Sequence, residues 1–304
     1  MIRLIKRRPL KWEASAFTRE EQSREYMRTE LITIETDTIP LEGLYYEPEG
    51  KIKGAALYFH GNTMNFYTGG AKFLAPALTA AGIAFFAFNR RGHDILSTRN
   101  SRTPVGGAFQ TIAESMADND YASQWLINKG FAKPILIGHS NGGMLAVAHA
   151  AKSLETPALV LMSAPRGGVG QDLKAGSEKL FAMDQADKIT AQAKELVAQG
   201  RGSELMSLPG WWYVISAESY LDRLVSIPDT ITLAPKITCP ILAIRGDMED
   251  MHRYPAEEFQ AACASKLCDV QIIKDCDHFY NGKEELVANL IAHWLEQKIS
   301  ISIV

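Results

Sequence analysis

Short apolar runs alternate with longer amphipathic segments along most of the chain. Apolar runs of this kind are typical of strands buried on both faces, and the segments between them have the length and spacing of helices. The predicted strands cover residues 54–59, 83–88, 135–138, 158–165, 240–245 and 269–274, and the predicted helices cover residues 69–81, 109–129, 255–264 and 284–297. Regular alternation of strand and helix predicts an α/β domain with a mostly parallel central sheet.

Two parts of the chain depart from this alternation. Residues 31–36 and 41–46 are short alternating segments separated by a turn, and they are expected to pair as an antiparallel hairpin. From residue 166 to residue 236 the strand pattern lapses, although helical stretches continue. A structureless loop of this length is improbable in a compact domain. We therefore expect a core domain of residues 1–165 and 237–304, with a helical insertion at residues 166–236.

One serine stands between a predicted strand and a predicted helix. The strand ends at Gly138, Ser140 follows, and Gly142 and Gly143 open an Ala- and Leu-rich segment of helical pattern. Because Gly138 and Gly142 carry no side chains, the strand and the helix can approach closely, while Ser140 takes a strained turn conformation. The Gly-x-Ser-x-Gly string is common by chance, so the surrounding strand and helix are what make Ser140 a candidate nucleophile.

Four motifs follow one another in the order of a known enzyme superfamily. They are Phe59-His60-Gly61-Asn62, the turn around Ser140, Arg245-Gly246-Asp247-Met248-Glu249 and Asp277-His278-Phe279. On these motifs the chain resembles a serine hydrolase of the α/β-hydrolase superfamily, over about residues 30–298. The resemblance implies an α/β-hydrolase fold in which the insertion at residues 166–236, after the sixth strand, forms a helical cap over the active site.

A serine hydroxyl needs a base to take its proton, and the base needs a carboxylate to orient its imidazole. His278 is the predicted base because it follows the last predicted strand, where this fold returns a loop to the nucleophile. Asp247, Glu249 and Asp250 compete for the role of the acid. In relatives the acid commonly stands three residues after the glycine at the strand end, which favours Glu249, then Asp250, with Asp247 as a turn former.

Acyl transfer also needs donors for the developing oxyanion, usually two backbone N–H groups. Asn141, immediately after the nucleophile, and Asn62, in the loop after an apolar strand, are expected to supply them. In the insertion, Trp211, Trp212 and Tyr213 are expected to pack between cap helices. Their alternative role is to bind substrate by lining an acyl or aromatic pocket.

Composition narrows the class of partner. The chain has 304 residues, a formal net charge of -3 and a pI near 6.2, with its charges interspersed, so nucleic acid is not expected as a partner. It contains no run of eighteen apolar residues, and its basic start lacks the apolar segment of a secretory signal, so stable membrane insertion is not expected. Four scattered cysteines favour a reducing compartment, and we expect a cytoplasmic protein. No two histidines have metal-ligand spacing on one helix, so neither a metal nor a cofactor is expected.

Together these features predict a serine hydrolase that cleaves a carboxylic ester of a small or medium-sized, partly apolar substrate through an acyl-enzyme. The same triad would serve a peptidase or amidase, a thioesterase, an acyltransferase or a C–C bond hydrolase, so the bond that is cleaved stays open. A non-catalytic protein that binds a small molecule under the cap is a more distant alternative, because such proteins often lose a triad member. The oligomeric state also stays open.

Overall fold

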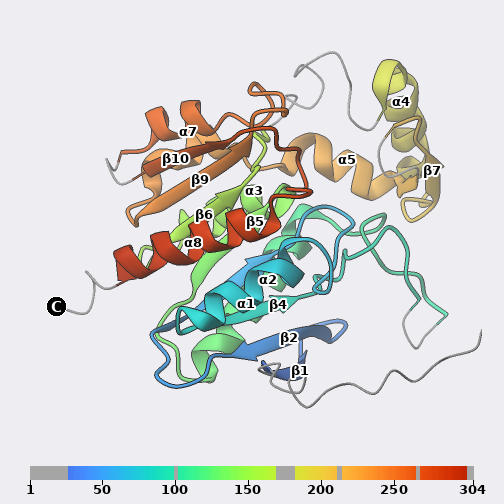
Figure 1. Cartoon of the computed structure of the whole chain (residues 1–304). Coiled ribbons are helices and arrows are strands. Elements are labelled where there is room, and N and C mark those ends of the chain that lie inside the picture. Colours follow the sequence, from blue (N-terminus) through green and yellow to red (C-terminus); the bar gives the residue numbers. More distant parts are fainter. Residues whose placement is uncertain (1–26, 99–101, 169–181, 211–213, 265–267, 300–304) are drawn as a thin grey trace, which may run out of the picture.

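The computed structural model describes residues 27–98, 102–168, 182–210, 214–264 and 268–299. Its centre is an eight-stranded sheet in the order β1-β2-β4-β3-β5-β6-β9-β10 (Figure 1). β2 is antiparallel to both β1 and β4. The other six strands of this sheet, β4, β3, β5, β6, β9 and β10, are parallel to one another. The strands are β1 Arg28–Ile34, β2 Leu41–Glu47, β3 Gly54–Phe59, β4 Ile83–Phe88, β5 Ile135–His139, β6 Leu159–Met162, β9 Ile241–Gly246 and β10 Cys268–Ile273.

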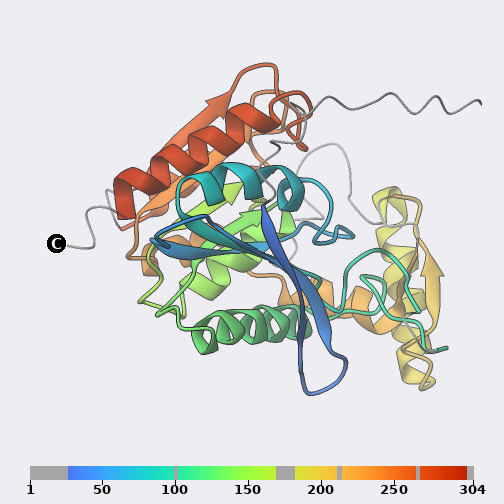
Figure 2. The same ribbon diagram turned by 60° about the horizontal axis from the view of Figure 1, so that its bottom comes forward.

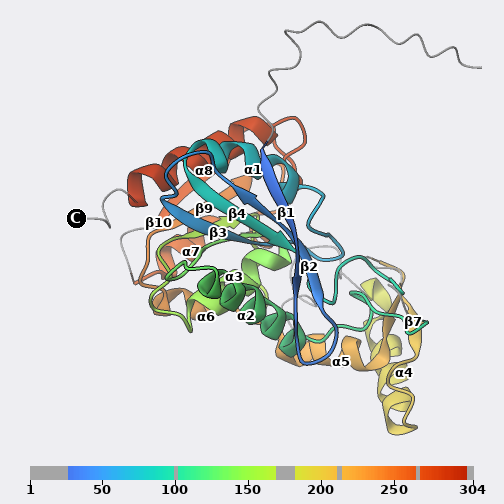
Figure 3. The same cartoon turned by 90° about the horizontal axis from the view of Figure 1, so that it is seen from below.

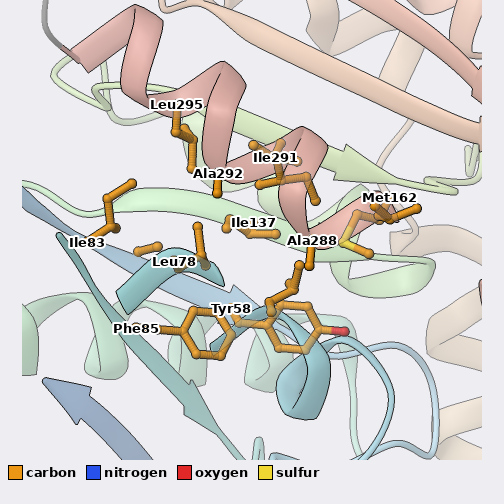
Figure 4. Packing of buried hydrophobic residues seen from close by; sticks show 14 of the residues in the cluster. Tyr58, Leu78, Ile83, Phe85, Ile137, Met162, Ala288, Ile291, Ala292 and Leu295 are labelled. Atoms are coloured by element: carbon orange, nitrogen blue, oxygen red, sulfur yellow. The ribbon is translucent and has the colours of Figure 1, made fainter. Parts of the chain in front are cut away.

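Helices cover both faces of this sheet, as Figure 3 shows from below. One face carries α1 (Gly70–Ala80) and α8 (Glu284–Ile299), and the other carries α2 (Ile112–Asn128), α3 (Asn141–Ala150) and α7 (Ala256–Ala262). Alternate strand residues serve the two faces, so that Tyr58 packs under α1 and α8 while its neighbours Leu57 and Phe59 pack under α2 and α3. Figure 4 shows the first of these cores, where Ile137 of the sheet lies close to Leu78 of α1 and Ile291 of α8.

The structure confirms the α/β-hydrolase fold and the order of its elements. Helix α2 begins at Ile112, three residues later than the pattern predicts, and the cause is local. The Thr111 side chain accepts a hydrogen bond from the Glu114 amide at 3.2 Å, and the Glu114 carboxylate accepts one from the Thr111 amide at 2.8 Å. This capping box satisfies two amides that would otherwise lack a partner, and so it sets the start of the helix.

The segment between β6 and β9 contains both helices and strands. It includes the 3-10 turn η2 Met183–Gln185, α4 Ala186–Ala198, β7 Leu205–Ser207, β8 Val214–Ser216, α5 Ala217–Ser226, α6 Thr230–Leu233 and the 3-10 turn η3 Ala234–Lys236. β7 and β8 form a separate antiparallel pair beside these helices, and the sequence did not predict it. The reason is that strands of three residues are too short to give a period in the sequence.

The insertion has a small core of its own and sits at one side of the sheet (Figure 2). Ile189 and Ala193 of α4 pack there against Met206, Ile215 and Tyr220. Two hydrogen bonds join it to the start of α2. The Ile112 amide donates to Asp222 Oδ2 at 2.7 Å, and the Ser216 amide donates to the Ala108 carbonyl at 2.8 Å. No helix in the described ranges has the length and apolar character needed to cross a membrane.

Candidate active site

Ser140 occupies the sharp turn between β5 and α3, with φ 54° and ψ -128°. The turn leaves no room for side chains around it. A Cβ on Gly142 would lie 2.0 Å from the Phe59 carbonyl oxygen, and a Cβ on Gly138 would lie 2.4 Å from the Gly142 carbonyl oxygen. Because backbone atoms cannot move aside as a flexible side chain can, both positions require glycine. The serine is thereby held at the carboxyl edge of the sheet, at the N-terminus of α3.

Three side chains from separate loops form one hydrogen-bonded chain at this edge. His278 Nε2 lies 3.0 Å from Ser140 Oγ, and His278 Nδ1 lies 2.6 Å from Glu249 Oε1. Ser140 is 5% exposed, and the side chains of His278 and Glu249 are 15% and 3% exposed. A proton can therefore pass from the hydroxyl to an imidazole whose far nitrogen faces a carboxylate.

Glu249 makes further hydrogen bonds through its second oxygen. Oε2 accepts from the Ser163 hydroxyl at 2.6 Å and from the Gly246 amide at 2.8 Å. Burial by itself raises the pKa of Glu249, but hydrogen bonds from His278 and Ser163 outweigh that effect and hold the pKa below its usual value. Glu249 is therefore charged at neutral pH. Arg245 also holds the turn, since its guanidinium donates to the Gly246 carbonyl at 3.2 Å.

The other two predicted acids have different partners. Asp247 Oδ1 accepts from the Cys276 amide at 3.3 Å, as expected of a turn former, and Asp250 Oδ1 accepts from the His252 amide at 2.9 Å. Asp250 is exposed. Of the three carboxylates, Glu249 is the one that the structure brings to His278.

The loop that carries His278 is held from two sides. Asp277 accepts hydrogen bonds from the amides of Phe279 and Asn281, each at 3.0 Å. From the elbow, His139 Nε2 lies 2.8 Å from the His278 carbonyl oxygen and donates to it. Burial, followed by repulsion from His278, lowers the pKa of His139 to about 4, so its imidazole is neutral at neutral pH. The residue before Ser140 thus helps to hold the backbone of the loop that carries His278.

The loop after β3 runs beside the serine. A Cβ on Gly61 would lie 3.3 Å from Ser140 Cβ, which puts the next amide, that of Asn62, near Ser140. In the part of the chain that the structure describes, neither the Asn62 amide nor the Asn141 amide donates to another protein group. Both amides are therefore available to an oxyanion. Trp211, Trp212 and Tyr213 are expected to pack between cap helices or, as the alternative, to line a substrate pocket, and they lie outside the described residues.

Sequence reasoning missed several contributors to this site. Ser163 and Tyr280 extend the hydrogen bonding of Glu249, and the buried Arg90 guanidinium donates to the carbonyl of His60 behind the Gly61 loop. Ser163 follows β6 directly, and residues after parallel strands gather at one edge of a sheet. That rule could have placed Ser163 near the site, although no local pattern marks its partner.

A mostly parallel sheet, with a serine in the turn after its central strand and a histidine after its last strand, defines the α/β-hydrolase class of proteins. The chain belongs to this family, since the model of the "Alpha/beta hydrolase family" matches residues 56–290. Comparison of the sequence with curated proteins gives no significant match.

Several solved structures share the fold at low sequence identity. Est1E from Butyrivibrio proteoclasticus is 17% identical with a TM-score of 0.60, and 89% of this chain aligns with 99% of that one. The esterase domain of a Rhodothermus marinus protein is 18% identical with a TM-score of 0.60, over 90% of this chain and 100% of that one. The α/β-hydrolase GrgF from Penicillium sp. sh18 is 14% identical with a TM-score of 0.70, over the same two shares of 90% and 100%. At these identities the likeness carries the fold alone, and family membership makes the protein a hydrolase of this fold.

Proposed function

We propose that the protein is a serine hydrolase that cleaves carboxylic esters through an acyl-enzyme. The observation that carries the proposal is the unbroken chain from Ser140 Oγ through His278 to Glu249, with spacings of 3.0 and 2.6 Å. Among the structures that are similar in fold, two are named as an esterase or an esterase domain and one as a proline iminopeptidase, so an ester is the first substrate class to test and a peptide is its alternative.

In the proposed first half-reaction, Ser140 Oγ attacks the ester carbonyl while His278 Nε2 takes its proton. Glu249 stabilises the imidazolium that forms and keeps Nε2 facing the serine. The amides of Asn62 and Asn141 stabilise the oxyanion of the tetrahedral intermediate, and loss of such a donor costs roughly a hundred- to a thousandfold in turnover. His278 then gives its proton to the alcohol that leaves.

In the second half-reaction, water replaces the alcohol and His278 acts as base again, so the acid product leaves and Ser140 is regenerated. The proposed chemistry uses side chains, backbone amides and water. We also propose that residues 166–236 act as a cap that shapes the substrate site. The segment leaves the sheet after β6, at the same carboxyl edge that carries Ser140.

Labelling with a fluorophosphonate probe tests this proposal. Covalent modification is expected at Ser140, and Ser140→Ala and His278→Ala should abolish it. Ser153→Ala is the matched control, because Ser153 lies beyond the far end of α3 and should leave labelling unchanged. A series of p-nitrophenyl esters with increasing acyl length should then show turnover that depends on Ser140. A folded wild-type protein that neither labels nor turns over any ester would contradict the proposal, and turnover of amides or thioesters instead would correct its substrate class.

A further inference from the structure

Two buried hydroxyl groups continue the hydrogen-bonded chain beyond Glu249. Ser163 Oγ lies 2.6 Å from Glu249 Oε2, and Tyr280 Oη lies 2.8 Å from Ser163 Oγ. Ser163 follows β6 directly, whereas Tyr280 lies in the loop after β10, two residues beyond His278. Each residue is 1% exposed, so water does not compete for these hydrogen bonds.

The direction of both hydrogen bonds follows from a count of protons. An ionised carboxylate only accepts, so the single proton of Ser163 must point to Glu249. Tyr280 must then donate to Ser163, because the other acceptor near its hydroxyl, the Ile244 carbonyl oxygen, is more distant at 3.4 Å. Burial raises the pKa of Tyr280 well above its usual value, so the phenol keeps the proton that it donates.

The backbone conformation at both positions also indicates a functional role. Ser163 has φ 49° and Tyr280 has φ 62°, in the left-handed region where glycine is the favoured residue. A glycine would relieve this strain at either position but would remove the hydroxyl. Strained non-glycine residues of this kind gather at functional sites, where the side chain compensates for the cost of the backbone.

We propose that Ser163 and Tyr280 are positioning residues that hold the Glu249 carboxylate in the orientation required by His278. The proposal rests on the proposed hydrolase function and adds two residues to its machinery. Glu249 has one more side-chain torsion than an aspartate would have, so it needs more restraint. The Gly246 amide and the Ser163 hydroxyl both bind Oε2, and this leaves Oε1 directed at His278 Nδ1.

Three variants test the role of these hydroxyls. Ser163→Gly and Ser163→Ala remove the donor to Glu249, and Tyr280→Phe removes only the second hydroxyl. We expect kcat/KM to fall roughly tenfold in the Ser163 variants and less in Tyr280→Phe, with KM nearly unchanged, because a charge-assisted hydrogen bond is lost. Tyr121→Phe on α2 is the matched control, since its hydroxyl accepts from the Asp37 amide far from the triad and its loss should leave kcat/KM unchanged.

The pH dependence separates positioning from a structural role. Loss of the Ser163 donor removes one of the hydrogen bonds that hold the pKa of Glu249 below its usual value, so this pKa should rise and the acidic limb of kcat/KM should move up by about half a pH unit. Because glycine suits a positive φ, Ser163→Gly relieves strain that Ser163→Ala keeps, so Ser163→Gly should be the more stable of the two variants in urea while both are less active than the wild type.

The outcomes distinguish this proposal from the one on which it rests. If the wild type labels at Ser140 but Ser163→Gly keeps wild-type kcat/KM and an unshifted acidic limb, the positioning role is wrong and the hydrolase proposal stands. The positioning role is also overturned if activity falls only in proportion to the loss of folded protein. If the folded wild type neither labels at Ser140 nor turns over any ester, both proposals are wrong.

Discussion

Glu249→Gln is the substitution that most directly tests how the triad is built. The change preserves the shape of the side chain and removes its charge. Glu249 Oε2 receives two donors, the Ser163 hydroxyl at 2.6 Å and the Gly246 amide at 2.8 Å. The glutamine must therefore turn its carbonyl oxygen toward these donors, because its NH2 group would otherwise face the fixed backbone N–H of Gly246.

This orientation of the amide has a consequence for His278. The NH2 group then occupies the place of Oε1 and donates to Nδ1, which was 2.6 Å from the carboxylate oxygen. The imidazole must accept at Nδ1 and carry its proton on Nε2, the nitrogen that lies 3.0 Å from Ser140 Oγ. A protonated Nε2 cannot take the serine proton. In a serine protease triad, the corresponding change of the aspartate to asparagine imposes this tautomer and lowers kcat about 10⁴-fold, so we expect a loss of roughly 10³- to 10⁴-fold here.

The assay is steady-state hydrolysis of the best p-nitrophenyl ester, with fluorophosphonate labelling rates as a second readout. KM should change little, because Glu249 is buried beneath the imidazole and does not reach the substrate. Asp250→Asn is the matched control, since this exposed carboxylate binds the His252 amide, and it should leave kcat within about twofold. A kcat for Glu249→Gln within tenfold of the wild type, or an equal loss in Asp250→Asn, would refute the assignment of the acid.

Two other predictions concern the stability of the fold around the site. Gly142→Ala should lower the free energy of unfolding by more than about 3 kcal/mol or abolish folding, because its Cβ would lie 2.0 Å from the Phe59 carbonyl oxygen. Gly200→Ala is the comparison: φ is positive there but no atom lies within 4 Å, so the loss measured by urea unfolding should be only about 1 kcal/mol. Acid should also destabilise the protein through His139, whose folded-state pKa of about 4 lies below the value of about 6.5 in the unfolded chain. Between these values the unfolded state binds a proton that the folded state does not, so about 3 kcal/mol should be lost as the pH falls from 6.5 to 4. The lowered pKa of Glu249 acts in the same direction. Urea midpoints measured from pH 7.5 to 4.5 should fall less steeply in His139→Gln, and an equal slope would contradict this account.

More of the fold than of the candidate site could be predicted from the sequence. The parallel strands other than β10 are buried on both faces, so their apolar runs and the helices between them could be located by pattern. Ser140 could be named because it follows such a strand directly, and His278 because it lies in the loop after the last predicted strand. β7 and β8 could not be located, since three residues are too few for a period. Ser163 and Tyr280 could not be named, because they come from the loops after β6 and β10 and no local pattern marks them as neighbours of Glu249.

Backbone strain is concentrated at the carboxyl edge of the parallel sheet, where the sequence predicts the site. In the described ranges, six residues other than glycine have a positive φ: Thr63, Asp94, Ser140, Ser163, Asp275 and Tyr280. Each one follows the carboxyl end of a parallel strand, namely β3, β4, β5, β6 or β10. Serine, threonine and tyrosine do not favour this conformation, so the packed sheet must impose it on them. Strain of this kind is found where a side chain must be held in one direction. Three of these six residues, Ser140, Ser163 and Tyr280, belong to the series of hydrogen bonds that runs from Ser140 to Tyr280. The rigid sheet therefore serves as the support that holds these hydroxyls in position, and among variants that lose a hydroxyl the one that relaxes the backbone should keep the greater stability.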